Sequence, residues 1–362
     1  MSSSDYSVAS LYSGAGGLDL GFQQAGFELQ WAIDFDRHAV ETYNRNIADH
    51  AVCGDVLQHD PPPGLRPDVL IGGPPCQGFS VIGRMNPSDE RSKHVFHFLD
   101  VVADLRPRAF VMENVKALAV NERWAGIREG LRKRAKSLGY EVDVFVLNAS
   151  HYGVPQARER MFLIGYRDGV PTKPAATTKD RPPTVREALA VLPRIGEPGN
   201  DGVCTARVIP ARAPVMRPTA YRGSLMFNGS GRPLYLDGAA KTLPASMGGN
   251  ATPIIDQDEL DHGALPWAVE YHARLMAGKP PLKRAPKRMR RITVQEAAVL
   301  QTFPATWEFQ GPQGARYRQI GNAVPPNLAH EVANAVREHL ASIDGLQDEV
   351  ATLDRDAAFA TA

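Results

Sequence analysis

The sequence has few cysteines and no long apolar stretch. Its three cysteines, Cys53, Cys76 and Cys204, are odd in number and far apart, which argues against a disulfide framework and against a structural zinc site. No apolar stretch approaches the ~20 residues of a membrane span. The first residues, MSSSDYSVASLYSG, lack the basic start and apolar core of a secretory signal. We therefore expect a cytoplasmic protein with no metal site and no membrane association.

The chain also has little net charge, but its charges are unevenly distributed. The total is +1 over 362 residues. Residues 171–290 hold 18 Lys and Arg against 10 Asp and Glu, a net charge of +8, which leaves −7 for the remainder. A basic segment beside an acidic body indicates a polyanionic partner, although a solvated loop surface would have the same composition.

Short apolar stretches alternate with amphipathic ones in the first part of the chain. Strands are predicted at 7–12, 28–34, 67–73, 108–115, 141–149 and 160–167, and helices are predicted between most of them. This alternation is typical of an α/β fold, a mostly parallel sheet with helices on both faces. In such a sheet, ligands bind at the carboxyl ends of the strands.

The pattern changes at about residue 169, where Pro, Gly and Arg become frequent and helical periodicity fades. Helical periodicity returns near residue 292. We therefore predict a catalytic and cofactor-binding domain at 1–168 and a smaller, loop-rich domain at 169–288. Residues 289–345 are predicted to return to the first domain as helices, and 346–362 to form a frayed tail.

A glycine-rich loop, SGAGG at 13–17, follows the first predicted strand and precedes a helix. Glycines let the backbone approach a ligand, and a helix start offers unpaired N–H groups. Asp34 ends the next strand, where a carboxylate can bind a pair of ribose hydroxyls. Asp55, in CGDV, could accept a hydrogen bond from an exocyclic amine. Each of these acids could equally cap a helix or form a turn.

The stretch IGGPPCQGFS at 71–80 places Cys76 behind two glycines and two prolines. The prolines stiffen the loop, so Cys76 is either a buried thiol in a tight turn or a nucleophile held in a cleft. Glu113, in MENV, could hold or donate a proton, or could be only a salt-bridge partner. Arg158 and Arg160, two residues apart in QARER, would share one face of a strand. They could hold carbonyl oxygens or anions, or lie on the surface.

Together these segments resemble the bacterial DNA cytosine-5 methyltransferases. Six motifs occur in the family's order, namely LYSGAGGLDLGF, GGPPCQGFS, MENV, HYGVPQARERMFLIG, RRITVQEAAVLQTFP and QIGNAVPPNLA. The resemblance implies a Rossmann-like methyltransferase domain and places the family's target-recognition domain at about 170–288. It also implies methyl transfer from S-adenosylmethionine, which becomes S-adenosylhomocysteine, to carbon 5 of a cytosine flipped out of a short duplex DNA site.

The resemblance also implies a role for each motif residue. Cys76 would attack carbon 6 of cytosine, and Glu113 would contact nitrogen 3 and the exocyclic amine. Arg160 would hold the carbonyl oxygen at position 2 with Arg158 beside it, and Asn114 would brace the loop. The implied cofactor contacts are Tyr12, Gly14, Gly17, Asp34, Phe35, Asp55, Val56, Pro75 and Asn322.

Predicted DNA contacts fall in three segments. The loop at 80–93 could close over the flipped base, or could be a plain connection, and contributes Ser80 and Arg84. Arg suits guanine and Asn suits adenine, and the candidates for reading bases are Arg222, Arg232 and Asn250. The basic run KRAPKRMRR at 283–291 would contact phosphates, with Lys287 and Arg288 as candidates, or would be a solvated linker.

Two other functions remain open at this point. A tRNA cytosine methyltransferase of the same fold is disfavoured by the QGFS after Pro-Pro-Cys and by the long recognition region. A silent DNA-binding regulator is disfavoured because Cys76, Glu113, Arg158 and Arg160 are all present. We expect a monomer that binds double-stranded DNA. It would work either with a cognate restriction endonuclease at the same site or as a solitary methylase.

Overall fold

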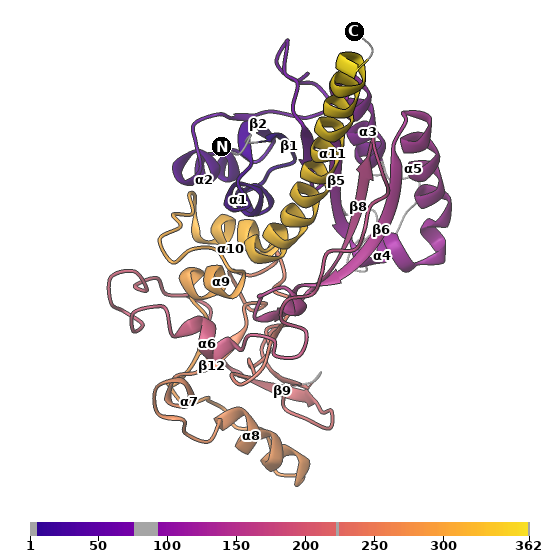
Figure 1. Cartoon of the computed structure of the whole chain (residues 1–362). Helices are drawn as coiled ribbons and strands as arrows, with labels where there is room; N and C mark the ends of the chain where they lie inside the picture. Colours follow the sequence, from indigo (N-terminus) through magenta and orange to yellow (C-terminus); the bar gives the residue numbers. More distant parts are fainter. Residues whose placement is uncertain (1–5, 76–92, 222–223, 361–362) are drawn as a thin grey trace.

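The computed structural model describes residues 6–75, 93–221 and 224–360, with side chains up to residue 346. Cys76, Ser80, Arg84 and Arg222 lie outside the described residues. Figure 1 shows a central sheet flanked by helices, with a loop-rich part below it. The sheet has seven strands in the order β3-β2-β1-β4-β5-β8-β6. Their bounds are β1 Ser7–Leu11, β2 Glu28–Asp34, β3 Ala51–Cys53, β4 Val69–Gly72, β5 Ala109–Val115, β6 Glu141–Asn148 and β8 Glu159–Tyr166.

Most neighbouring strands of this sheet are parallel. The pairs β1–β2, β1–β4, β2–β3 and β4–β5 are parallel, whereas β8 runs antiparallel to both β5 and β6. The predicted mostly parallel α/β fold is therefore confirmed. Strand β1 lies between β2 and β4, so the strand order reverses at its end, which is where ligands bind in open α/β sheets.

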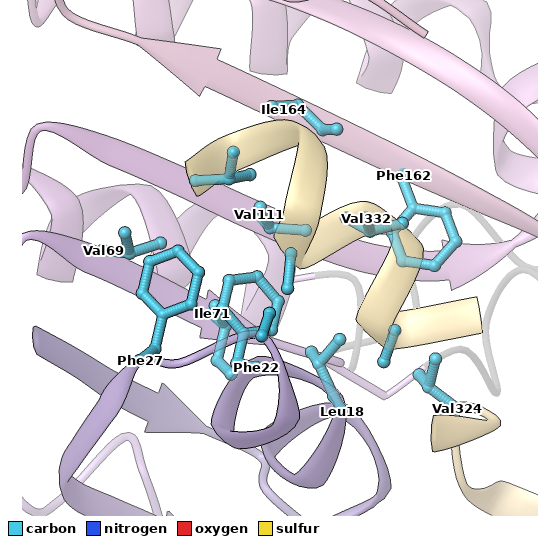
Figure 2. Close-up of a cluster of buried hydrophobic side chains, with 14 of the residues drawn as sticks. Leu18, Phe22, Phe27, Val69, Ile71, Val111, Phe162, Ile164, Val324 and Val332 are labelled. Atoms are coloured by element: carbon cyan, nitrogen blue, oxygen red, sulfur yellow. The ribbon is translucent and has the colours of Figure 1, made fainter. Parts of the chain in front are cut away.

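Helices cover both faces of the sheet. One face packs against α1 (Gly17–Gln24), α2 (Arg37–Asn46) and α11 (Pro326–Ala360), and the other against α3 (Lys93–Leu105), α4 (Lys116–Val120) and α5 (Ala125–Ser137). Because side chains alternate along a strand, Val69 and Ile71 of β4 join the first core cluster while Leu70 joins the second. Figure 2 shows Val69 next to Phe27 and Ile71 next to Phe22 of α1.

The segment predicted as a recognition domain has a small core of its own, which includes Phe227, Ile254, Tyr271 and Met289. Its elements are α6 Val185–Leu189, β9 Pro210–Val215, β10 Leu225–Phe227, β11 Ala240–Lys241, β12 Ile254–Asp256, α7 Gln257–His262, α8 Trp267–Met276 and β13 Met289–Arg291. Strand β13 pairs with β12, so residues 289–291 pack with this part of the chain. Long loops connect the elements (Figure 1).

The chain then returns to the sheet through α9 (Val294–Leu300), α10 (Gln313–Asn322) and α11. Helix α11 continues to Ala360, past residue 345, where the sequence indicates a frayed end. The stretch at 346–360 contains no Gly or Pro, the residues that most disfavour a helix interior. Three short elements remain among the described residues: β7 (Gln156–Ala157), which pairs with β11, and the 3₁₀ helices Glu122–Trp124 and Ala149–His151.

Candidate active site

A cavity of about 280 Å³ opens at the carboxyl end of β1. Its walls come from the glycine loop, the ends of β2, β5 and β8, residues 73–75, and residues 318–324 of α10 and the turn after it. Segments that are far apart in the sequence thus meet at the sheet edge where the strand order reverses. This is the edge at which the sequence predicts the motifs to gather.

Two glycines of the loop, Gly14 and Gly17, affect the site in different ways. Gly14 has a φ of 55°, and a Cβ placed there would meet nothing within 4 Å, so the backbone is open to a ligand. A Cβ on Gly17 would lie 2.3 Å from the carbonyl oxygen of Val324, so only glycine lets α1 approach the turn after α10. Asp34 holds the loop, because its Oδ2 accepts a hydrogen bond from the Gly14 N–H at 2.8 Å.

Most of the predicted cofactor residues lie in the cavity wall. These are Tyr12, Gly14, Gly17, Asp34, Phe35, Pro75 and Asn322. Phe35 is 72% exposed, an unusual position for a large apolar ring and one suited to stacking on a flat ligand. Burial raises the pKa of Asp34. Hydrogen bonds from backbone N–H groups stabilise its charged form and oppose this rise.

Asp55 and Val56 are not among the residues that line the cavity. The Oδ1 of Asp55 accepts from the Leu57 N–H at 3.0 Å, so this carboxylate forms the turn that the sequence left as its alternative role. Val56 is buried, and its carbonyl is bonded to the His97 ring at 3.0 Å. Their predicted cofactor contacts stay predictions.

Glu113 and Arg160 form an ion pair inside the cavity wall. Their Oε1 and Nε atoms are 3.0 Å apart, with side-chain exposures of 11% and 15%. They come from neighbouring antiparallel strands, since Val115 of β5 pairs with Arg160 of β8. Burial raises the pKa of Glu113, and the charges of Arg160 and Arg158 oppose this rise. Burial thus favours the neutral form of this carboxyl, and the two arginines favour its charged form.

The base of the Pro-Pro-Cys loop is fixed against this ion pair. Asn114 is buried, and its Nδ2 donates to the Pro74 carbonyl at 3.1 Å, so the predicted bracing of the loop by Asn114 is confirmed. A Cβ on Gly73 would lie 3.3 Å from Oε2 of Glu113. Residues 73–75 therefore lie beside Glu113, immediately before Cys76.

Arg158 has different surroundings from Arg160. It is 1% exposed and donates to the carbonyls of Leu243 at 3.3 Å and Gly321 at 2.9 Å. It therefore ties β8 to the recognition segment and to α10. Although Arg158 lies in the cavity wall, these backbone carbonyls occupy its guanidinium, and the structure places it as a brace.

Replacing Arg158 by methionine is expected to lower the free energy of unfolding by about 3 kcal/mol, because buried carbonyls lose their charged donor. Urea denaturation followed by circular dichroism measures this change. The matched control is Arg212→Met on β9, an exposed arginine in the described structure, for which a change within about 0.5 kcal/mol is expected. Equal losses in the two variants would contradict the bracing role.

The two predicted phosphate contacts, Arg288 and Lys287, have different surroundings in the structure. Arg288 lies 3.4 Å from Asp256, 3.1 Å from Asp258 and 3.8 Å from Glu270, so its charge is largely compensated within the chain. Lys287 beside it is exposed.

The two candidates for base reading also differ in their bonds within the chain. Arg232 donates to the Ser230 carbonyl at 2.5 Å. Asn250 is exposed, and its Oδ1 accepts from the Asn228 amide at 2.9 Å. Asn250 is thus the more exposed of the two, and both base contacts stay predictions.

Other polar residues in the cavity wall were not identified from the sequence. Asp36 and Arg318 pair at 3.0 Å. Asp19, Ser10 and Ser13 are buried in the wall. A signal for Asp19 was present, because GLDLGF places one charge within an otherwise apolar stretch that begins a helix.

The described residues include neither a membrane-spanning helix nor a cluster of metal-binding side chains. Within the described ranges, no helix is both long and apolar enough to cross a membrane. The same ranges hold no group of three or more His, Cys, Asp or Glu side chains that could bind a metal ion.

Comparison with known proteins identifies the family. The family model for C-5 cytosine-specific DNA methylase matches residues 6–338. Among curated relatives, the Type II methyltransferase M1.HphI of Haemophilus parahaemolyticus is 32% identical, covering 90% of this chain and 85% of the relative. The Type II methyltransferase M.NgoPII of Neisseria gonorrhoeae is also 32% identical, covering 92% and 96%.

Solved structures share the fold at low identity. The S. pombe Dnmt2 methyltransferase has a TM-score of 0.64 and 18% identity, covering 93% of this chain and 99% of the other. The Entamoeba histolytica methyltransferase EhMeth has a TM-score of 0.67 and 13% identity, with the same coverage. The family match extends over nearly the whole chain and includes every element that forms the cavity. The chain therefore belongs to the C-5 cytosine-specific DNA methylases, enzymes that transfer a methyl group from S-adenosylmethionine to cytosine in DNA.

Proposed function

We propose that this methyltransferase acts on one cytosine within a short duplex DNA sequence, after that base has turned out of the helix into the cavity. The observation that carries the proposal is the Glu113–Arg160 pair, buried in the cavity wall beside the loop that leads to Cys76. A base inside a duplex cannot reach such a wall, so the target must leave the stack, at a cost of a few kcal/mol.

Cys76, Glu113 and Arg160 would each have a separate role in the reaction. Carbon 5 of cytosine is a poor nucleophile, and addition of the Cys76 thiolate to carbon 6 would make it an enamine. Glu113 would supply a proton or hydrogen bond to ring nitrogen 3, which increases the electron demand of the ring. Arg160 would hold the carbonyl oxygen at position 2 and keep Glu113 in place. Carbon 5 would then bond to the methyl group that the cofactor supplies. Loss of the carbon 5 proton to solvent and elimination of the Cys76 thiolate would release 5-methylcytosine.

The cavity suits the cofactor of the family. An open backbone at Gly14, the exposed ring of Phe35 and unpartnered buried hydroxyls on Ser10 and Ser13 offer contacts to a ligand with polar and aromatic parts. When bound, S-adenosylmethionine supplies an electrophilic methyl group. Asp34 and Asn322 would orient it, and residues 73–75 would separate it from the base.

The relatives are named Type II methyltransferases, and we propose that this enzyme likewise modifies the site of a restriction endonuclease. It would act as a monomer, with residues 169–288 reading the sequence and Lys287 contacting phosphate. A solitary methylase would have the same active site, and a search for an endonuclease that the modified site resists would separate the two.

The test is incubation with tritiated S-adenosylmethionine and either duplex DNA or tRNA. Label in duplex DNA alone is expected, because the recognition segment is long and contains exposed basic residues such as Lys287. Label in tRNA alone would favour the RNA methyltransferase, and label in neither would favour a silent DNA-binding protein. Methylation-sensitive sequencing of DNA from cells expressing the protein would then identify the modified cytosine.

A further inference from the structure

We infer that Asp19 makes the cofactor cavity selective for charge, so that it favours the cationic S-adenosylmethionine over the neutral S-adenosylhomocysteine and couples binding of the cation to release of a proton. The two ligands differ by the methyl group and by the positive charge on sulfur. A fixed negative charge in the wall therefore separates them where shape alone cannot. This inference rests on the proposed placement of the cofactor in the cavity.

Asp19 lies in the first turn of α1 and is fully buried in the cavity wall. Its Oδ1 accepts from the hydroxyl of Tyr43 at 3.1 Å. Its Oδ2 has no hydrogen-bond partner among the described residues. A buried carboxylate with an oxygen left unpartnered is costly for the fold, and a cation bound nearby would offset that cost.

The other carboxylates of the wall are already compensated. Asp36 pairs with Arg318 at 3.0 Å, and Glu113 pairs with Arg160 at 3.0 Å. Asp34 accepts from two backbone N–H groups, each at 2.8 Å. Among the described residues Asp19 pairs with no cation, and hydroxyl groups are the side chains that stabilise its charge. The Ser13 hydroxyl, which has no hydrogen-bond partner in the described structure, is a further polar group of this wall.

The surroundings of Asp19 also allow it to titrate. Burial raises its pKa to about 7, while the hydroxyls of Ser10 and Tyr43 oppose the rise and the charge of Asp34 adds to it. The facing titratable groups are Tyr43 on α2, with His50 bonded to its hydroxyl at 3.0 Å, and Asp34 on β2. Near neutral pH, Asp19 is therefore partly protonated when the cavity is empty.

The sign of the linkage follows from this titration. A bound cation stabilises the charged carboxylate and lowers the pKa of Asp19, so binding releases a proton. Affinity for the cationic cofactor should then rise with pH up to about 7 and level off above it. Affinity for S-adenosylhomocysteine should change little over the same range, because that ligand brings no net charge.

Isothermal titration calorimetry of the full chain tests this directly. S-Adenosylmethionine, sinefungin, whose amine replaces the sulfonium, and S-adenosylhomocysteine are titrated at pH 7 in two buffers of different ionisation enthalpy. We expect proton release with the first two ligands and none with the third. Asp19→Asn should abolish the release and weaken both cations on the order of tenfold, with less than about a twofold change for S-adenosylhomocysteine. Phe35→Ala is the control, since loss of stacking should weaken all three ligands alike.

A second variant keeps the Asp19 carboxylate but shifts its pKa. Tyr43→Phe removes the hydrogen bond to the charged form, so the pH midpoint for S-adenosylmethionine binding should shift upward, with wild-type affinity recovered at high pH. The inference is overturned if this midpoint does not move, or if Asp19→Asn leaves either the proton release or the ratio of the two affinities unchanged. Wild-type protein that binds none of the ligands, or that is insensitive to Phe35→Ala, would instead overturn the placement of the cofactor.

Discussion

Replacing Cys76 by alanine is expected to reduce methyl transfer to below about one-thousandth of the wild-type rate, because no other group can add to carbon 6. Binding of the same DNA duplex should be largely retained, since the thiol contributes little contact area. A single-turnover assay with tritiated cofactor and a gel-shift titration measure the two quantities separately.

The covalent adduct gives an independent readout. A duplex with 5-fluorocytosine at the target should trap wild-type enzyme in a complex that survives denaturing electrophoresis, because fluorine cannot leave as a proton does. The Cys76→Ala variant should form none. Cys204→Ala is the matched control, because that thiol lies outside the cavity wall, near the Thr252 hydroxyl at 3.9 Å. Turnover by the Cys76 variant would remove the nucleophile from the mechanism.

Glu113→Gln is expected to slow methyl transfer by ~100-fold or more, the usual scale of acid–base assistance. Glutamine keeps the size of the side chain and can still accept from Arg160, so the fold should be preserved. What it loses is the titratable carboxyl, whose pKa is raised by burial. The measurement is the single-turnover rate with enzyme in excess over DNA.

Glu159→Gln provides the comparison for this prediction. Glu159 is on β8, the strand that pairs with that of Glu113, but it is 45% exposed and pairs with Lys116 at 2.9 Å on the surface. Surface pairs of this kind contribute about 0–1 kcal/mol, so its methylation rate should stay close to wild type. An unchanged rate in the Glu113 variant, or equal losses in both variants, would exclude a role for the Glu113 proton.

The strands and helices of the sheet were predictable because each carries a local signal. The strand predicted at 28–34 is β2 with the same bounds, and a helix, α2, follows it as predicted, since apolar spacing of period 2 or 3.6 is a property of the stretch itself. Helix α10 lies in the range predicted as helical, but the sequence indicates no bounds for it. It begins after Pro312, is rich in polar residues, and is fixed by the cavity it closes rather than by a strong apolar stripe.

The α/β alternation, the order of the motifs and the edge of the sheet at which they meet were all predictable, because they follow from local periodicity and from the connection rules of parallel sheets. The partner of each charged group could not be predicted in this way. Arg158 donates to Gly321, which is 163 positions away, and Arg288 is held by acids of its own domain. Asp19 is left with an oxygen that has no partner in the described structure. Such pairings depend on which distant segments come into contact, and no local pattern encodes that contact.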